Sequence, residues 1–214
     1  MNKARFEAFS DGVFAFAITL LIIGISLPAF KGGTPSEGQL TAALVGLWPN
    51  FLAYLLSFAV IGIVWQNHHA LFRLVATVDR ATVFVNLGLL SATAFIPFAT
   101  STLGTYPTMR PSTFLYGLTL TACATMYNLM LNHLVSSRAF FGNVSAASIR
   151  QTVIAYRVGW VTYAIAMLLA LAAPIVSFGL YLLIAGYYLV PRGLDRDTPE
   201  VIAAAGGSEA EARG

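Results

Sequence analysis

Long apolar segments recur along this chain, and they constrain its fold more than any other feature of the sequence. A helix needs roughly 20 mostly apolar residues to cross about 30 Å of hydrocarbon, and segments of about that length occur repeatedly. Only 10% of the residues are charged, whereas about a quarter are charged in a typical soluble domain. An outer-membrane barrel would show short alternating strands instead. The sequence therefore predicts an all-α, polytopic membrane protein.

Six of these segments are predicted to be transmembrane helices, separated by polar turns and prolines. Pro174 divides the last apolar stretch into two, and the final helix is short for a full crossing. The predicted helices cover residues 9–30, 44–66, 81–103, 113–135, 152–172 and 175–190. They form one transmembrane domain over residues 1–192, and residues 193–214 are predicted to be a flexible cytoplasmic tail.

The positive charges predict the orientation of these helices. With six spans, both termini lie on the same side of the membrane, and ten of the 12 Lys and Arg residues fall on that side. The other two are Lys31 and Arg110. Positive residues stay cytoplasmic, so we expect a multi-pass protein of the plasma membrane with both termini in the cytoplasm.

The chain lacks the motifs of an enzyme or a metal site. It has no Gly-rich phosphate loop, no His-Glu-x-x-His motif and no nucleophile elbow. Its one cysteine, Cys123, cannot form a disulfide within the chain, and its three histidines have no zinc-site spacing. We therefore expect no enzymatic activity, no cofactor and no bound metal. The net charge of +3 is too small to imply a nucleic-acid partner.

The first predicted helix has two different faces. At about 100° per residue, one face is apolar except for a single threonine hydroxyl, and all its members lie within about 60° of Phe16. These members are Phe9, Gly12, Val13, Phe16, Thr19, Leu20, Ile23 and Leu27. Ser10 and Asp11 point away from that face by about 120° and 140°. On residue types alone, an apolar face in a membrane helix usually marks packing or lipid contact.

Asp11 needs a partner, because a carboxylate inside a membrane span is costly. An anchoring or capping role is its commonest explanation, and a direct ion ligand is the alternative. The second predicted helix ends in Trp65-Gln66-Asn67-His68-His69 at the same side of the membrane. We therefore expect these interfacial side chains to hydrogen-bond Asp11 or Ser10, with Trp65 in the aromatic belt.

The fourth predicted helix carries a polar stripe at helical spacing. Such a stripe most often forms hydrogen bonds between packed helices, and the alternative is a water-filled path. Its members are Thr121, Thr125, Asn128 and Asn132.

Two short motifs carry a resemblance to a known family. Arg5-x-x-x-Phe9-Ser10-Asp11-Gly12, followed by Ala17-Ile18-Thr19-Leu20-Leu21, resembles the first-helix signature of the transmembrane protein 175 family. Trp65-x-x-His68-His69 is similar to that family's second-helix pattern. The length and the span count resemble its prokaryotic branch, whose chains have a single six-helix repeat.

The resemblance implies a potassium-permeable channel, assembled as a homotetramer in the lipid bilayer around four copies of the first helix. The implied pore-lining residues are Phe16, Thr19, Leu20 and Ile23, with Leu27 in a secondary position. Phe16 departs from the family, which more often has Ile or Leu there. The implied structural network comprises Arg5, Phe9, Ser10, Asp11, Trp65, His68 and His69.

The expected mechanism is a hydrophobic constriction rather than a carbonyl filter. The sequence Thr-Val-Gly-Tyr-Gly does not occur in the chain, and apolar rings gate by dewetting. Potassium would bind transiently near the Thr19 hydroxyls, with modest selectivity over sodium. The alternative is a secondary transporter or proton-coupled carrier. Such proteins commonly show inverted repeats and acidic relays, and paired carboxylates do not occur inside the predicted spans.

Overall fold

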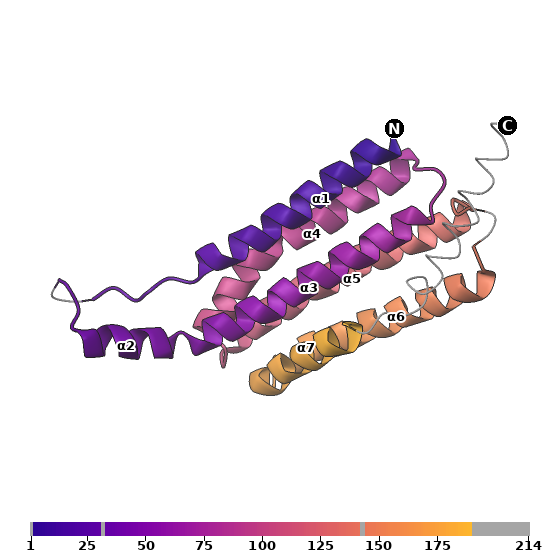
Figure 1. Cartoon of the computed structure of the whole chain (residues 1–214). Helices are drawn as coiled ribbons and strands as arrows, with labels where there is room; N and C mark the ends of the chain where they lie inside the picture. Colours follow the sequence, from indigo (N-terminus) through magenta and orange to yellow (C-terminus); the bar gives the residue numbers. More distant parts are fainter. Residues whose placement is uncertain (1, 31–32, 142–143, 190–214) are drawn as a thin grey trace.

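The part of the chain that the computed structural model describes, residues 2–30, 33–141 and 144–189, is a bundle of α-helices (Figure 1). In chain order these are α1 (Lys3–Leu20), the 3-10 helix η1 (Leu21–Gly24), α2 (Glu37–Gly46), α3 (Trp48–Arg73), α4 (Arg80–Thr105), α5 (Arg110–Ser136), α6 (Ala146–Leu169) and α7 (Pro174–Tyr188). Within these described residues, five helices are long and apolar enough to cross a membrane: α1 continued by η1, α3, α4, α5 and α6. The last helix, α7, is apolar but has only 15 residues.

The long helices run roughly alongside one another (Figure 1). α4 packs against α1, α3 and α5, and α5 packs in turn against α6, which also contacts α7. α1 is therefore at the edge of the bundle, where it contacts α3 and α4 on one side only. At the end that carries the N-terminus, Lys3 donates from Nζ to the Val75 carbonyl at 2.7 Å. This contact ties the start of α1 to the loop after α3.

The prediction of a first helix over residues 9–30 is wrong at both ends. The helix begins at Lys3, because the Asn2 side chain accepts a hydrogen bond from the Ala4 amide at 3.0 Å and caps it. It ends at Gly24, and Ile25 is already extended. Pro28 lacks an amide hydrogen and disfavours helical angles at the residue before it. Leu27, the predicted secondary pore-lining residue, consequently lies outside the helix.

The prediction of a second helix over residues 44–66 merges parts of two helices. Ser36 and Gln39 form a capping box that starts α2. The chain breaks at Leu47, and α3 starts at Trp48 because Pro49 is tolerated only in the first turn of a helix. α3 continues to Arg73. The motif from Trp65 to His69 therefore lies within the helix rather than at its very end.

The other four predicted helices correspond to α4, α5, α6 and α7, with their ends shifted by a few residues. α6 shows the largest shift: it starts at Ala146, where Ser145 caps it, rather than at Thr152. The predicted tail over residues 193–214 lies outside the described residues.

Gly117 allows α5, α6 and α7 to approach one another closely. A Cβ atom at this position would collide with the Tyr181 hydroxyl group and would lie 2.9 Å from the Met167 Cα atom. Gly62 is its matched control, because a Cβ atom there meets nothing within 4 Å.

We expect Gly117→Ala to lower the free energy of unfolding by about 1–3 kcal/mol, as overpacking does. Gly62→Ala should be neutral or stabilising, because alanine favours a helix by about 1 kcal/mol over glycine. Thermal unfolding in detergent compares the two variants. Equal melting temperatures for both would contradict the close packing at Gly117.

Candidate functional site

Helix α1 has one face that is packed against its own subunit. The side chains on this face repeat every three or four residues and are almost completely buried. They are Phe6, Ser10, Phe14, Ala17 and Leu21. Their contacts with α3 and α4 fix the rotation of α1 about its axis, so the direction of its other face is fixed too.

The opposite side of α1, which we call the bare face, is uncovered. It consists of Phe9, Gly12, Phe16, Thr19 and Ile23. Phe16 is 65% exposed and Ile23 is 72% exposed, although both are large apolar side chains. Leu20, the remaining predicted pore residue, is half-buried at the edge of this face. The three residues from Phe16 to Ile23 that share the face extend over roughly 10 Å of helix.

Thr19 supplies the only side-chain oxygen of the bare face. Its hydroxyl donates its hydrogen to the Phe16 carbonyl at 2.8 Å. A threonine hydroxyl has one donor and two acceptor lone pairs. Because the hydrogen is used within the helix, the exposed side of the oxygen presents lone pairs, which suits it to contact a cation.

Asp11 is held by a tryptophan of α3. The Trp65 indole donates from Nε1 to the Asp11 carboxylate at 2.9 Å. His69, one turn further along α3, stacks on the Trp65 ring with a centroid distance of 6.1 Å. A hydrogen bond to an ionised carboxylate is stronger than one between neutral groups, so this contact is a firm link between α1 and α3.

Ser10 is held by a second, buried chain of hydrogen bonds. The Asn86 side chain of α4 donates from Nδ2 to the Ser10 hydroxyl at 2.9 Å, and Ser10 donates to the Phe6 carbonyl at 3.0 Å. The Asn86 Oδ1 atom lies 2.9 Å from Nε2 of His68 on α3. Since Oδ1 can only accept, His68 donates through Nε2. Three helices are thereby joined through one asparagine.

Aromatic rings enclose His68, which lies at one end of this series of hydrogen bonds. Phe14 meets the imidazole edge-on at 5.4 Å, and Phe72 lies 4.6 Å from it. His68 is only 1% exposed. A buried polar network of this kind specifies one arrangement when every member has its partner. We call the six residues Ser10, Asp11, Trp65, His68, His69 and Asn86 the anchor of α1.

Comparisons with known proteins identify the family. Residues 5–97 match the family described as "Endosomal/lysosomal potassium channel TMEM175". A potassium channel of Streptomyces collinus is 39% identical over 194 residues, which cover 88% of this chain and 92% of the relative. The chain belongs to the TMEM175 family. All members of the anchor lie within the matched residues.

Solved and curated relatives agree with this assignment. The crystal structure of a lysosomal potassium-selective channel TMEM175 homolog from Chamaesiphon minutus superimposes with a TM-score of 0.78 at 34% identity. The match covers 87% of this chain and 96% of that one. The human endosomal/lysosomal proton channel TMEM175 is 42% identical over 103 residues, or 46% of this chain and 20% of the human protein.

Two residues of the family signature lie outside the anchor, contrary to the predicted network. Arg5 is exposed, and it forms no ion pair with Asp11. Phe9 is 57% exposed and belongs to the bare face, because it lies seven residues, about two helical turns, before Phe16. Conversely, the sequence reasoning missed Asn86. An amide side chain within an apolar span was the available signal, since such groups need partners.

The polar stripe of α5 forms hydrogen bonds with α6. Thr125 accepts from the Trp160 indole at 2.8 Å, and Asn128 donates to the Tyr156 carbonyl at 3.1 Å. Arg157 donates to Asn132 at 3.5 Å. The Thr121 hydroxyl oxygen is buried and has no hydrogen-bond partner within the described ranges. Interhelical bonding, the commoner of the two interpretations, therefore accounts for three of the four residues.

No cluster of three or more His, Cys, Asp or Glu side chains that could hold a metal ion occurs among the described residues. The bare face and the anchor of α1 remain as the candidate site.

Proposed function

We propose that this chain is one subunit of a potassium-permeable channel, in which α1 from each of four identical subunits lines a central pore. The bare face of α1 carries this proposal. It is apolar, it is continuous over two turns, and the anchor directs it away from the subunit that bears it. Relatives that match most of the chain are named potassium channels, which favours a pore over lipid contact for this face.

The pore would be closed to ions by apolar side chains and opened by widening. Phe16 and Ile23 of four subunits form rings in which water is unstable when the rings are narrow. Leu20, at the edge of the bare face, would line the contact between neighbouring α1 helices and reach the pore as they rotate. Ions pass when the rings separate enough to stay wet.

Selectivity would come from the ring of Thr19 hydroxyls between these apolar rings. Four oxygen atoms with free lone pairs replace part of the hydration shell of a cation, and potassium loses its shell more readily than sodium. One ring of hydroxyls offers fewer ligands than stacked carbonyl cages, so the selectivity is modest. No resident cofactor is needed.

The proposed subunit crosses the plasma membrane six times, with both termini in the cytoplasm. In this arrangement α7 is the sixth crossing. Its 15 residues extend over about 22 Å, so the membrane would thin around it. The excess of Lys and Arg at the end that carries the N-terminus supports this orientation.

Reconstitution of the purified protein in planar bilayers tests the proposal. A channel gives discrete current steps that reverse near the potassium equilibrium potential. A smooth flux that saturates at carrier rates would contradict the channel and favour a secondary transporter.

Replacing Thr19 by valine should reduce selectivity. Valine keeps the shape of threonine but removes the oxygen, so we expect the potassium-to-sodium permeability ratio to fall about threefold or more, toward one. Thr19→Ser keeps the oxygen and is the matched control. Reversal potentials with potassium on one side and sodium on the other give the ratio. An unchanged ratio in Thr19→Val would show that the hydroxyl does not contact the permeating ion.

A further inference from the structure

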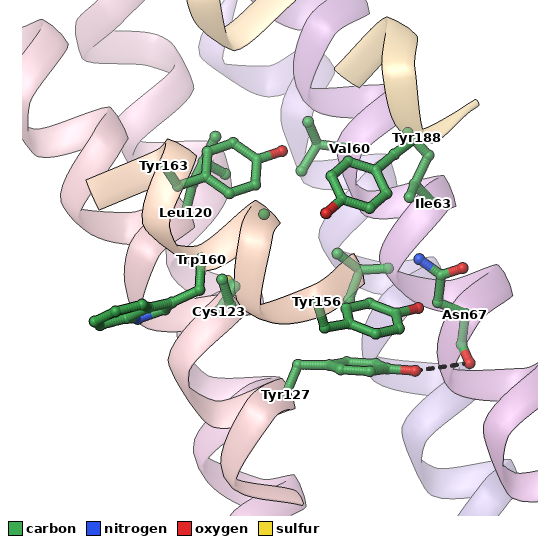
Figure 2. Close-up of a pocket in the computed structure, with 13 residues that line it drawn as sticks. Val60, Ile63, Asn67, Leu120, Cys123, Tyr127, Tyr156, Trp160, Tyr163 and Tyr188 are labelled. Carbon is green, nitrogen blue, oxygen red and sulfur yellow. Dashed lines mark hydrogen bonds between the residues drawn. The ribbon is translucent and has the colours of Figure 1, made fainter. Parts of the chain in front are cut away.

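A cavity of about 60 Å³ lies between α3, α5, α6 and α7, on a different face of α3 from the one that holds α1 (Figure 2). With the space on its open side included, the volume is about 570 Å³. From α3 it is lined by Val60, Ile63, Val64 and Asn67, which repeat every three or four residues. Asn67 lies about 9 Å from the end of α3 at Arg73, so the cavity is close to the membrane surface in the proposed topology.

Aromatic rings form much of the cavity wall. Tyr127 and Tyr156 stack with a centroid distance of 4.4 Å, and Tyr188 lies nearly parallel to Tyr156 at 6.5 Å. In Figure 2 the rings of Tyr163 and Tyr188 extend toward each other from opposite sides of the cavity. Ring faces and edges of this kind favour contact with another aromatic ring.

Two polar groups in the cavity have no hydrogen-bond partner within the described part of the chain. They are the Asn67 side-chain amide and the Tyr163 hydroxyl. The neighbouring tyrosine hydroxyls, in contrast, are paired. Tyr127 donates to the Asn67 carbonyl at 2.9 Å, and Tyr188 donates to the Ala155 carbonyl at 2.8 Å. An amide offers two donors and one acceptor. Leaving such groups unpaired inside a membrane protein is unfavourable, so an occupant that pairs with them is stabilised.

We propose that this cavity binds small, neutral aromatic alcohols of the phenol type, which enter from the surrounding lipid. None of its described lining side chains is charged, so an ionised ligand would lack a counter-charge. The ring would contact the tyrosines, and the hydroxyl would pair with Asn67 and Tyr163. A lipid tail would contact the rings but leave both polar groups unpaired. The closed part of the cavity fits the hydroxyl and the adjoining ring edge, and the rest of the ring occupies the open side.

The position of the cavity links it to the candidate pore helix. Asn67 precedes His68 on α3, and Trp65 lies two residues earlier, so one helix contacts both the cavity and the anchor. Binding should therefore restrain α3 and change the potassium flux. This consequence rests on the proposed channel function, whereas binding itself does not.

Trp160 lines the cavity and reports its occupancy. The test is titration of the protein in detergent with 4-bromophenol, whose bromine quenches tryptophan fluorescence on contact. We expect saturable quenching that disappears in Trp160→Phe and in the cavity-filling variant Ala124→Phe. Tyr163→Phe should weaken binding about three- to tenfold, the usual effect of one hydrogen bond. Val64→Phe fills the same space from α3 and replaces Ala124→Phe if that variant does not fold.

Each result bears on one part of the inference. Quenching that rises linearly with concentration, or that is unchanged in a folded cavity-filling variant, would overturn the binding site. Equal affinity in Tyr163→Phe and for bromobenzene would overturn the assignment to alcohols. Saturable quenching without any change in flux would leave the site in place and overturn only its link to α1. If the parent protein shows no potassium flux even without 4-bromophenol, that result contradicts the proposed channel function instead.

Discussion

Replacing Ile23 by lysine should abolish potassium flux without preventing assembly of the subunits. Ile23 is 72% exposed on the bare face, so its substitution leaves the packing within the subunit unchanged. In a homotetramer the variant places four positive charges around a narrow passage. Repulsion of a cation in such a low-dielectric constriction is strong, and we expect flux to fall at least about 100-fold. Potassium efflux from loaded liposomes measures it.

Ile23→Gln is the matched control for this experiment. Glutamine is similar in length to lysine and polar but uncharged, so it should stabilise water in the constriction and maintain or increase the flux. Chromatographic size shows whether both variants assemble as the parent does. If Ile23→Lys assembles and still releases potassium at the parent rate, Ile23 does not line the pore.

Replacing Asn86 by leucine should release α1 from its own subunit. The substitution leaves the Ser10 hydroxyl and the His68 imidazole without the partner that they share. Each buried group left unpaired costs about 1–3 kcal/mol, so we expect a loss of about 2–4 kcal/mol in the free energy of unfolding. Because α1 is the proposed pore helix, potassium flux should fall by more than the fraction of folded protein does.

Asn128→Leu separates the anchor from a general effect of losing an amide in the membrane. Asn128 bonds from α5 to the Tyr156 carbonyl of α6, away from α1. An interhelical hydrogen bond in a membrane is worth about 0.6 kcal/mol, so this variant should be only slightly destabilised and should conduct normally. Thermal unfolding and liposome flux compare the two. Similar losses in both variants would show that Asn86 has no particular role in holding α1.

The periodicity of the sequence predicted the bare face of α1, and its long apolar segments predicted a helical protein, because both depend on local spacing. Phe16, Thr19 and Ile23 recur every three or four residues, and the same count places Ser10 and Asp11 on the other side. The prediction that Leu27 lines the pore is wrong for an equally local reason. Counting 100° per residue assumes that the helix continues to Leu27, whereas Pro28 and the extended Ile25 end it.

The anchor could be predicted only in part. Asp11 is a carboxylate within a membrane span, and Trp65 is a hydrogen-bond donor at the membrane interface. Their chemistry therefore predicted a pairing, although 54 residues separate them. Asn86 is 76 residues from Ser10, and nothing in local spacing brings the two together. Their contact depends on how α4 packs between α1 and α5, a tertiary choice that helical periodicity does not encode. The cavity beside α3 forms between four helices, so it could not be predicted from the sequence either.

The central claim, that the bare face of α1 lines an aqueous pore, is tested most directly by silver block of cysteine variants. Ile23→Cys and Leu183→Cys are matched, because Ile23 is 72% exposed in the subunit and Leu183 on α7 is 70% exposed. The native Cys123 is buried, so the parent protein should resist silver ions. We predict that silver stops potassium flux through Ile23→Cys and leaves Leu183→Cys unaffected, since we expect Leu183 to face lipid rather than the pore. Flux through Ile23→Cys that continues in silver, or equal block of both variants, would contradict a pore lined by α1.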